Sequence, residues 1–170
     1  MVSWRPRLEA ALGSAYAFQD RIEEAHRLLE ESERESADMR TRLFQAQRAT
    51  WRSEVYWLAG DIDRAEQTAT DALDAARRQR ERGSEAWALR TIAEIAAGGS
   101  RVADAPGHYF QAMAIARELG MKPLLAHCHL GLARVLRWGL DEDGAARELA
   151  AAATLFRETS MPHSLSQLGQ

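Results

Sequence analysis

The sequence predicts an all-α protein, a superhelical solenoid of four helix-turn-helix units. Two observations favour this fold: an internal repeat with a period of 40 residues, and a composition rich in alanine with only 4 prolines. One position of the repeat is alanine in all four units, and the position twelve residues earlier is always small. The alanines, here called the column alanines, are Ala25, Ala65, Ala105 and Ala145, and the small residues are Gly13, Ser53, Ala93 and Ala133. We expect the column alanines to be buried where the two helices of each unit cross, because units of such an array bury their faces against one another.

Length and composition are those of an ordinary globular protein. The 170 residues suffice for a substantial core, and we expect residues 1–170 to form a single domain. The formal net charge of −3 argues against a dominant surface for nucleic acid. The one cysteine, Cys128, cannot form an internal disulfide, and the longest apolar run, residues 149–156, is too short to cross a bilayer. The N-terminus also lacks an apolar stretch of signal-peptide length, so we expect a cytoplasmic protein without nucleic-acid or membrane partners.

The first unit is expected over residues 4–40. Ser3 is placed to cap its first helix, and Pro6 is acceptable within the first turn. Apolar residues then recur at three- and four-residue steps up to a turn, where Asp20 is placed to cap the second helix. Neither glycine nor proline marks the end of that helix. Register alone therefore puts the break to the second unit at residues 37–41.

The second unit, residues 41–82, turns at Gly60 and Asp61. Glycine suits the left-handed position that ends a helix, and aspartate suits the N-cap of the next one. The return helix ends in a basic run, residues 77–82, before Gly83. Positive side chains at a helix C-terminus complement the helix dipole, which suffices to explain this run.

In the third unit, residues 83–120, Ser84 is placed to cap the first helix. Pro106 then falls where the other units have helix. Proline lacks a backbone donor and is tolerated only in a first turn, so the return helix should start late. We expect Asp104 to cap it and Gly120 to end it.

The fourth unit, residues 121–160, opens at Pro123 and turns at residues 139–141. A return helix rich in alanine and leucine follows. Met161 and Pro162 end this helix, and residues 161–170 are expected to form a C-terminal tail.

The spacing within the units separates classes of helical repeat. A 40-residue period alone would also suit HEAT-type repeats. In the first unit, however, Leu12-Gly13-x-x-Tyr16 is followed nine residues later by Ala25, and the second unit keeps Tyr56 and Ala65 at the same interval. This pattern resembles the tetratricopeptide repeat, here with about six extra residues joining successive units. The resemblance implies a right-handed superhelix whose concave face holds extended or helical peptides.

Three positions depart from the tetratricopeptide pattern: Arg52 stands in its leucine column, and Ala96 and Leu136 stand in its tyrosine column. Residues 80–90 and 116–132 are similar to the tetratricopeptide tail of bacterial adenylate/guanylate cyclase proteins that also carry an ATPase module. No cyclase or ATPase motif occurs in the sequence. The resemblance therefore implies a regulatory or scaffolding tail, free-standing or part of a larger protein, without cyclase activity of its own.

His127-Cys128-His129 suggests a metal site, but side chains at adjacent and alternate helical positions point about 100° and about 200° apart, so the three cannot converge on one ion. No His-Glu-x-x-His, Cys-x-x-Cys or Gly-x-Ser-x-Gly motif occurs. Acidic pairs such as Asp61 and Asp63 stand at helix starts, where capping and the helix dipole explain them. We therefore expect no enzymatic activity, no metal and no cofactor.

The resulting hypothesis is a non-catalytic interaction or scaffold module that binds a peptide or partner protein, with self-association left open. By the tetratricopeptide resemblance, its binding residues lie on the first helix of each unit, on the inner side of the superhelix. They are Gln47, Glu54 and Trp57 in the second unit, Trp87, Arg90 and Glu94 in the third, and His127, Arg134 and Arg137 in the fourth. Arginine and tryptophan dominate interface energetics. We expect one continuous concave face that exposes Trp57, Arg90, Arg134 and Arg137.

A purely structural role for these residues is also compatible with the sequence. Tryptophans that pack between units, and acids that pair with the arginines, would produce the same pattern. The alternative function is a ligand-sensing regulatory domain that controls an attached cyclase, ATPase or transcription-factor effector. Stabilisation by a small molecule, without a protein partner, would favour that alternative.

Overall fold

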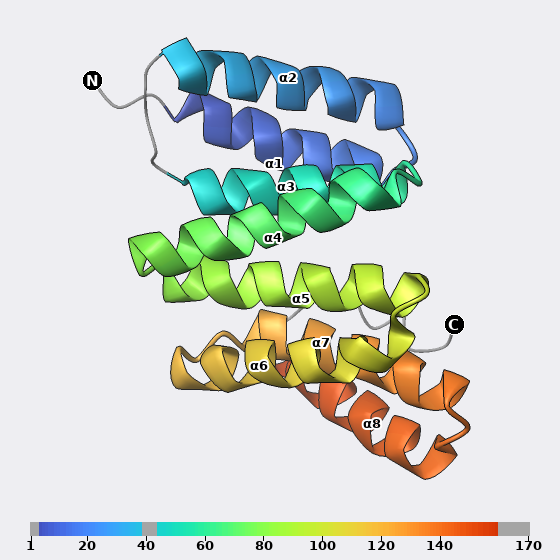
Figure 1. The fold of residues 1–170 in the computed structure, drawn as a ribbon. Coiled ribbons are helices and arrows are strands. Elements are labelled where there is room, and N and C mark those ends of the chain that lie inside the picture. Colours follow the sequence, from blue (N-terminus) through green and yellow to red (C-terminus); the bar gives the residue numbers. More distant parts are fainter. Residues whose placement is uncertain (1–3, 39–43, 160–170) are drawn as a thin grey trace. The chain divides into compact units, whose positions relative to one another are not determined.

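A computed structural model describes residues 4–38 and 44–159, and this part of the chain consists of α-helices joined by short turns (Figure 1). The helices are α1 Arg5–Ala17, α2 Ile22–Asp38, α3 Gln45–Leu58, α4 Ile62–Gln79, α5 Arg82–Gly98, α6 Ala105–Glu118, α7 Lys122–Trp138 and α8 Glu142–Glu158, with a 3-10 turn, η1 Val102–Asp104, before α6. No strand occurs among these residues, so the predicted all-α class is confirmed. Ser3, most of the predicted break at residues 37–41 and the tail from Met161 lie outside the described residues.

The chain divides into two compact parts, here called the N-terminal part (residues 1–91) and the C-terminal part (residues 92–170), and the division falls within α5. In the N-terminal part, α1 packs on α2, α3 packs on α4, and α1 also contacts α3. In the C-terminal part, α7 contacts both α6 and α8. None of the helices in the described part of the chain combines the length and the apolar composition that a bilayer span requires.

The column alanines are all at most 1% exposed, which confirms their predicted burial. The small residues twelve positions earlier explain this burial. An ideal Cβ built on Gly13 would lie 3.1 Å from the carbonyl oxygen of Ala25. In the next hairpin the Ser53 hydroxyl donates a hydrogen bond to the Ala65 carbonyl at 2.8 Å. The two helix backbones therefore approach so closely that a larger side chain does not fit between them.

Two of the turns between paired helices consist of a left-handed residue followed by a capping aspartate. Gly60 is left-handed as predicted, and the Asp61 carboxylate accepts a hydrogen bond from the backbone N–H of Arg64. Leu140 is also left-handed, and Asp141 accepts from the N–H of Gly144 at 2.8 Å. The prediction for the first turn was wrong, because Asp20 takes the left-handed position itself. Aspartate tolerates that conformation, so the turn forms without a glycine.

The predicted start of the third unit was also wrong. Helix α5 begins at Arg82, so Gly83 and Ser84 lie inside its first turn and neither caps it. The chain reverses instead at Arg80, whose backbone is left-handed with φ of 56°. This conformation lets the N–H of Glu81 bond to the carbonyl of Ala76, closing α4 in the way that glycine does elsewhere.

The late start of α6 is confirmed. The helix begins at Ala105 with Asp104 at its N-cap position and Pro106 in its first turn. The Asp104 side chain accepts no capping hydrogen bond, in contrast to the prediction. Because the 3-10 turn Val102–Asp104 leads directly into the helix, Asp104 has helical backbone angles, whereas a side-chain cap requires an extended residue.

Substitution of a column alanine tests the helix crossing. Ala65→Leu should lower the free energy of unfolding by about 1–3 kcal/mol, because the added carbons would overpack the contact between α3 and α4. Urea denaturation followed by circular dichroism measures the change. Ala114→Leu on the exposed side of α6 is the matched control, with an expected change within about 0.5 kcal/mol. A neutral Ala65→Leu would contradict the close crossing.

A second prediction concerns Gly131 of α7, which packs against the buried Tyr109 of α6. A Cβ at Gly131 would overlap the tyrosine hydroxyl, so Gly131→Ala should destabilise the protein by about 1–3 kcal/mol. At Gly107 of α6 an added Cβ meets nothing within 4 Å. Gly107→Ala should therefore be neutral or stabilising by up to about 1 kcal/mol. Thermal denaturation should show a lower Tm for Gly131→Ala and an unchanged or higher Tm for Gly107→Ala, and equal decreases would contradict the packing of α6 on α7.

Candidate functional site

In the N-terminal part, the predicted binding residue Arg90 contacts a second one, Glu54 of α3, whose side chain is 9% exposed. Its Oε2 accepts a hydrogen bond from the Ser14 hydroxyl on α1 at 3.0 Å. Its Oε1 lies 3.3 Å from Nη1 of Arg90 and 3.4 Å from the hydroxyl of Thr91, both on α5. A buried carboxylate is tolerated only where donors replace its water, and here donors come from two neighbouring helices. Glu54 therefore ties α1, α3 and α5 together.

Arg90 is enclosed, in contrast to the prediction that it is exposed. Its side chain is 13% exposed, and its guanidinium lies over the Trp87 ring, 5.7 Å from the ring centroid. A cation above an indole is attracted by the negative face of the ring. The carboxylate of Glu54 and the ring of Trp87 thus hold Arg90 in place. Arg90 and Glu54 therefore stabilise the N-terminal part and do not present free charge to a partner.

Two further predicted binding residues, both on α3, lie at the surface of the N-terminal part. Gln47 is half-buried, and its side-chain oxygen accepts a hydrogen bond from Nε of Arg7 on α1 at 2.9 Å. Trp57 is half-buried and lies near the end of α3. The N-terminal part therefore presents to a partner the partly exposed indole of Trp57 and the side-chain amide of Gln47, with Arg7 beside that amide.

The C-terminal part holds an arginine–glutamate pair whose two side chains differ in exposure. Glu94 of α5 is 6% exposed, whereas 47% of the Arg134 side chain on α7 is exposed. Nη2 of Arg134 lies 3.1 Å from one oxygen of Glu94 and 3.0 Å from the other. The Nε and Nη1 groups of Arg134 find no acceptor among the residues that the structure describes. The buried carboxylate therefore fixes one end of the guanidinium and leaves its other N–H groups available at the surface.

Arg137 and His127 complete the predicted set. Arg137 is exposed and lies one helical turn after Arg134 on α7, so the two guanidiniums share a face. His127 instead packs edge-to-face on Phe156 of α8, with 5.2 Å between the ring centroids. His127 is therefore part of the contact between α7 and α8 and is not placed to bind a partner with Arg134.

The three histidine and cysteine side chains of α7 diverge. Cys128 is buried, and Nδ1 of His129 lies 2.5 Å from a carboxylate oxygen of Glu148 on α8. Within residues 4–38 and 44–159 no three metal-binding side chains gather in a group that could hold an ion. His127 and His129 therefore join α7 to α8.

The sequence interpretation missed Arg7, Ser14 and Thr91, although the repeat contains a signal for two of them. Arg7 and Gln47 are 40 residues apart, as are Ser14 and Glu54, and Glu94 and Arg134. Each pair occupies the same repeat position in successive units. In a helical array, equivalent positions on stacked helices lie side by side, so residues one period apart are contact candidates.

The fold resembles that of two proteins with solved structures. The chain aligns with the aspartyl phosphate phosphatase F of Bacillus subtilis over 99% of its own length and 45% of that chain, with a TM-score of 0.78 and 12% identity. It also aligns with a signal transduction ATPase with numerous domains from Pyrococcus horikoshii, which carries a tetratricopeptide repeat sensor, over 97% of its own length and 26% of that chain, with a TM-score of 0.73 and 16% identity. At these identities the similarity establishes a tetratricopeptide-like fold and nothing about activity. The chain spans less than half of either protein.

No protein-family model matches the chain, and no curated protein is significantly similar to it in sequence. Its function is therefore inferred from its own residues and from the fold.

The two arginine–glutamate pairs should differ in their effect on stability. Arg90→Ala should lower the free energy of unfolding by about 1–3 kcal/mol, because it removes a donor from the buried carboxylate of Glu54. Arg134→Ala should cost at most about 1 kcal/mol, because the Arg134 side chain is 47% exposed and its removal lets water reach the Glu94 carboxylate that it covers. Urea denaturation of both variants measures the difference, and equal losses would contradict the contrast in burial.

Proposed function

We propose that this chain is a non-catalytic interaction module that binds an acidic peptide or partner protein through the first helices of its hairpins. The observation that supports this most directly is Arg134, which is anchored on the buried Glu94 yet half exposed. The tetratricopeptide-like fold supports an interaction or regulatory role in general.

In the proposed complex, a carboxylate of the partner accepts hydrogen bonds from Nη1 and Nε of Arg134 and from Arg137. A planar guanidinium can bind a carboxylate through two parallel hydrogen bonds. The pairing with Glu94 restricts the rotamers of Arg134 before the partner arrives, which reduces the entropy that binding costs. Within residues 1–91, Trp57 and Gln47 are proposed as separate contacts, because partly exposed tryptophan is favoured at interfaces.

A regulatory role within a larger protein is a second candidate. The tetratricopeptide repeat of the Pyrococcus horikoshii ATPase is described as a sensor, and the present chain spans 26% of that protein. Residues 80–90 and 116–132 resemble the tail of cyclase proteins that carry an ATPase module. On this proposal the chain regulates an attached cyclase, ATPase or other effector and has no catalytic activity itself. Self-association would use the same arginines on acidic residues of a second copy.

A capture experiment with matched variants tests the proposal. Wild-type protein, the Arg134→Ala/Arg137→Ala double variant and the control Arg157→Ala, which removes an exposed arginine from α8, are immobilised and exposed to extract of the source cell. Partners recovered with wild type are identified, and their Kd values for each variant are measured by calorimetry. The double variant should bind at least about tenfold more weakly, since hot-spot arginines contribute more than about 1 kcal/mol each.

The control should bind like wild type, and circular dichroism should show that all three proteins are equally folded. Equal affinity of wild type and the double variant for every recovered partner would place the binding surface elsewhere. Saturable stabilisation by a small molecule in the absence of any protein partner would favour the sensory role.

A further inference from the structure

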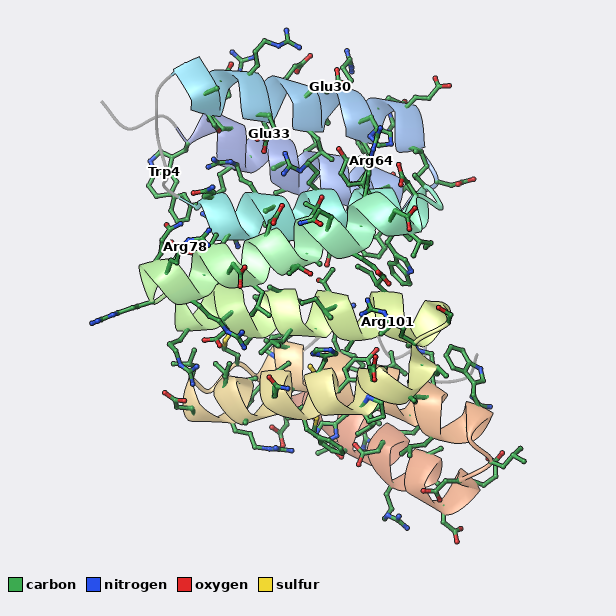
Figure 2. The ribbon with its side chains drawn as sticks, in the orientation of Figure 1. Trp4, Glu30, Glu33, Arg64, Arg78 and Arg101 are labelled. Carbon is green, nitrogen blue, oxygen red and sulfur yellow. The ribbon has the colours of Figure 1, made fainter. Side chains whose placement is uncertain are left out.

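A second region of the N-terminal part carries charges that the proposed interaction surface does not use. A cleft of about 590 Å³ opens between α2, α3 and α4. Three arginines line it, Arg48 and Arg52 from α3 and Arg78 from α4, together with Glu33 from α2 and Asp71 from α4. Figure 2 labels Glu33 and Arg78, which come from two of the three helices that border the cleft, α2 and α4. The cleft therefore contains one more positive than negative side chain.

The charged residues of this cleft replace apolar residues of the repeat. The position of Arg48 is apolar in the other three units, and so is the position of Arg52. These equivalents are Leu8, Ala88 and Cys128 for Arg48, and Leu12, Ile92 and Leu132 for Arg52. Glu33 likewise stands where the second and third units have the buried residues Leu73 and Met113. Ala88, Cys128 and Leu132 are also buried, so these are packing positions in the third and fourth repeat units, whereas Leu8 and Leu12 of the first repeat unit are exposed.

Such replacements cost stability. Arg48 is 6% exposed, and burial lowers the pKa of its guanidinium, while the nearby Glu33 opposes this effect and Arg52 adds to it. Arg48 and Arg52 lie one turn apart on the same face of α3, where like charges repel. The carboxylate of Glu33 pairs with Nη1 of Arg52 at 2.9 Å. Two apolar residues would avoid these costs, so the arginines indicate a role beyond packing.

We propose that the cleft binds a compact oxyanion, a phosphate or carboxylate group of a small molecule, with Arg48, Arg52 and Arg78 as its donors. Guanidinium groups bind both kinds of anion through paired hydrogen bonds. The cleft volume lies in the range of small-molecule sites, about 300–1,000 Å³. The anion competes with Glu33 for Arg52 and offsets the repulsion between the two arginines of α3. This site lies on α2, α3 and α4 and does not include Arg134 or Arg137.

Calorimetric titration of the full chain at low ionic strength tests the proposal, with inorganic pyrophosphate and citrate as separate probes. Saturable binding of at least one probe is expected, and the probe that binds identifies the anion as phosphate-like or carboxylate-like. Glu33→Gln should raise the affinity at least threefold, because it removes the competing carboxylate. Arg48→Leu/Arg52→Leu should lower it more than tenfold and leave the protein folded, since apolar residues occupy these positions in the other units.

Two further variants keep the test decisive. Arg64→Leu removes an exposed arginine of α4 that does not line the cleft, and should leave the affinity unchanged. Arg78→Gln should weaken binding at least threefold even if the double variant does not fold. The proposal is overturned if neither probe binds wild type, if Arg64→Leu weakens binding as much as Arg78→Gln, or if Glu33→Gln destabilises the protein without raising the affinity. In that last case the charges form only a structural ion-pair network.

Discussion

The close crossing of the two helices within a hairpin is the constraint on which the remaining structure depends. At Gly13 the backbone of α1 approaches the Ala25 carbonyl so closely that even a methyl group has little room. In the following hairpin Ser53 fills the same place and uses its hydroxyl to bond the Ala65 carbonyl. Because the crossing recurs every 40 residues, it sets which face of each first helix meets the neighbouring hairpin. The side chains at one repeat position are thereby brought together between successive units.

The polar pairs follow from this register. Ser14, Glu54, Glu94 and Arg134 share one repeat position, and the structure pairs Ser14 with Glu54 and Glu94 with Arg134. The pairs nevertheless differ in chemistry. Glu54 is enclosed by donors and serves stability, whereas Arg134 is held at one end and exposed at the other. The cleft at Arg48 and Arg52 is a further departure, since charge there replaces the apolar residues of the other repeat units, which are buried at Ala88, Cys128 and Leu132.

Features that depend on local backbone chemistry could be predicted from the sequence. Small residues at a fixed spacing identified the crossings, Pro106 located the start of α6, and Gly60 and Asp61 located a turn. The start of α5 was missed because the sequence interpretation ended the preceding helix before Gly83, whereas the chain reverses at Arg80, an arginine in the left-handed conformation. The burial of Arg90 was missed because periodicity shows which face a residue occupies, and not whether a carboxylate of another helix and an indole of the preceding turn cover it.

The central claim, that equivalent positions of successive units interact directly, is tested by a double-mutant cycle on Ser14 and Glu54. Urea denaturation of Ser14→Ala, Glu54→Ala and the double variant gives their coupling energy. The hydrogen bond between α1 and α3 predicts a coupling of about 0.5–1.5 kcal/mol. A control cycle on Ser14 and Asp71, which lines the cleft on α4, should be additive. Additivity of the Ser14 and Glu54 substitutions would contradict the register of the repeats.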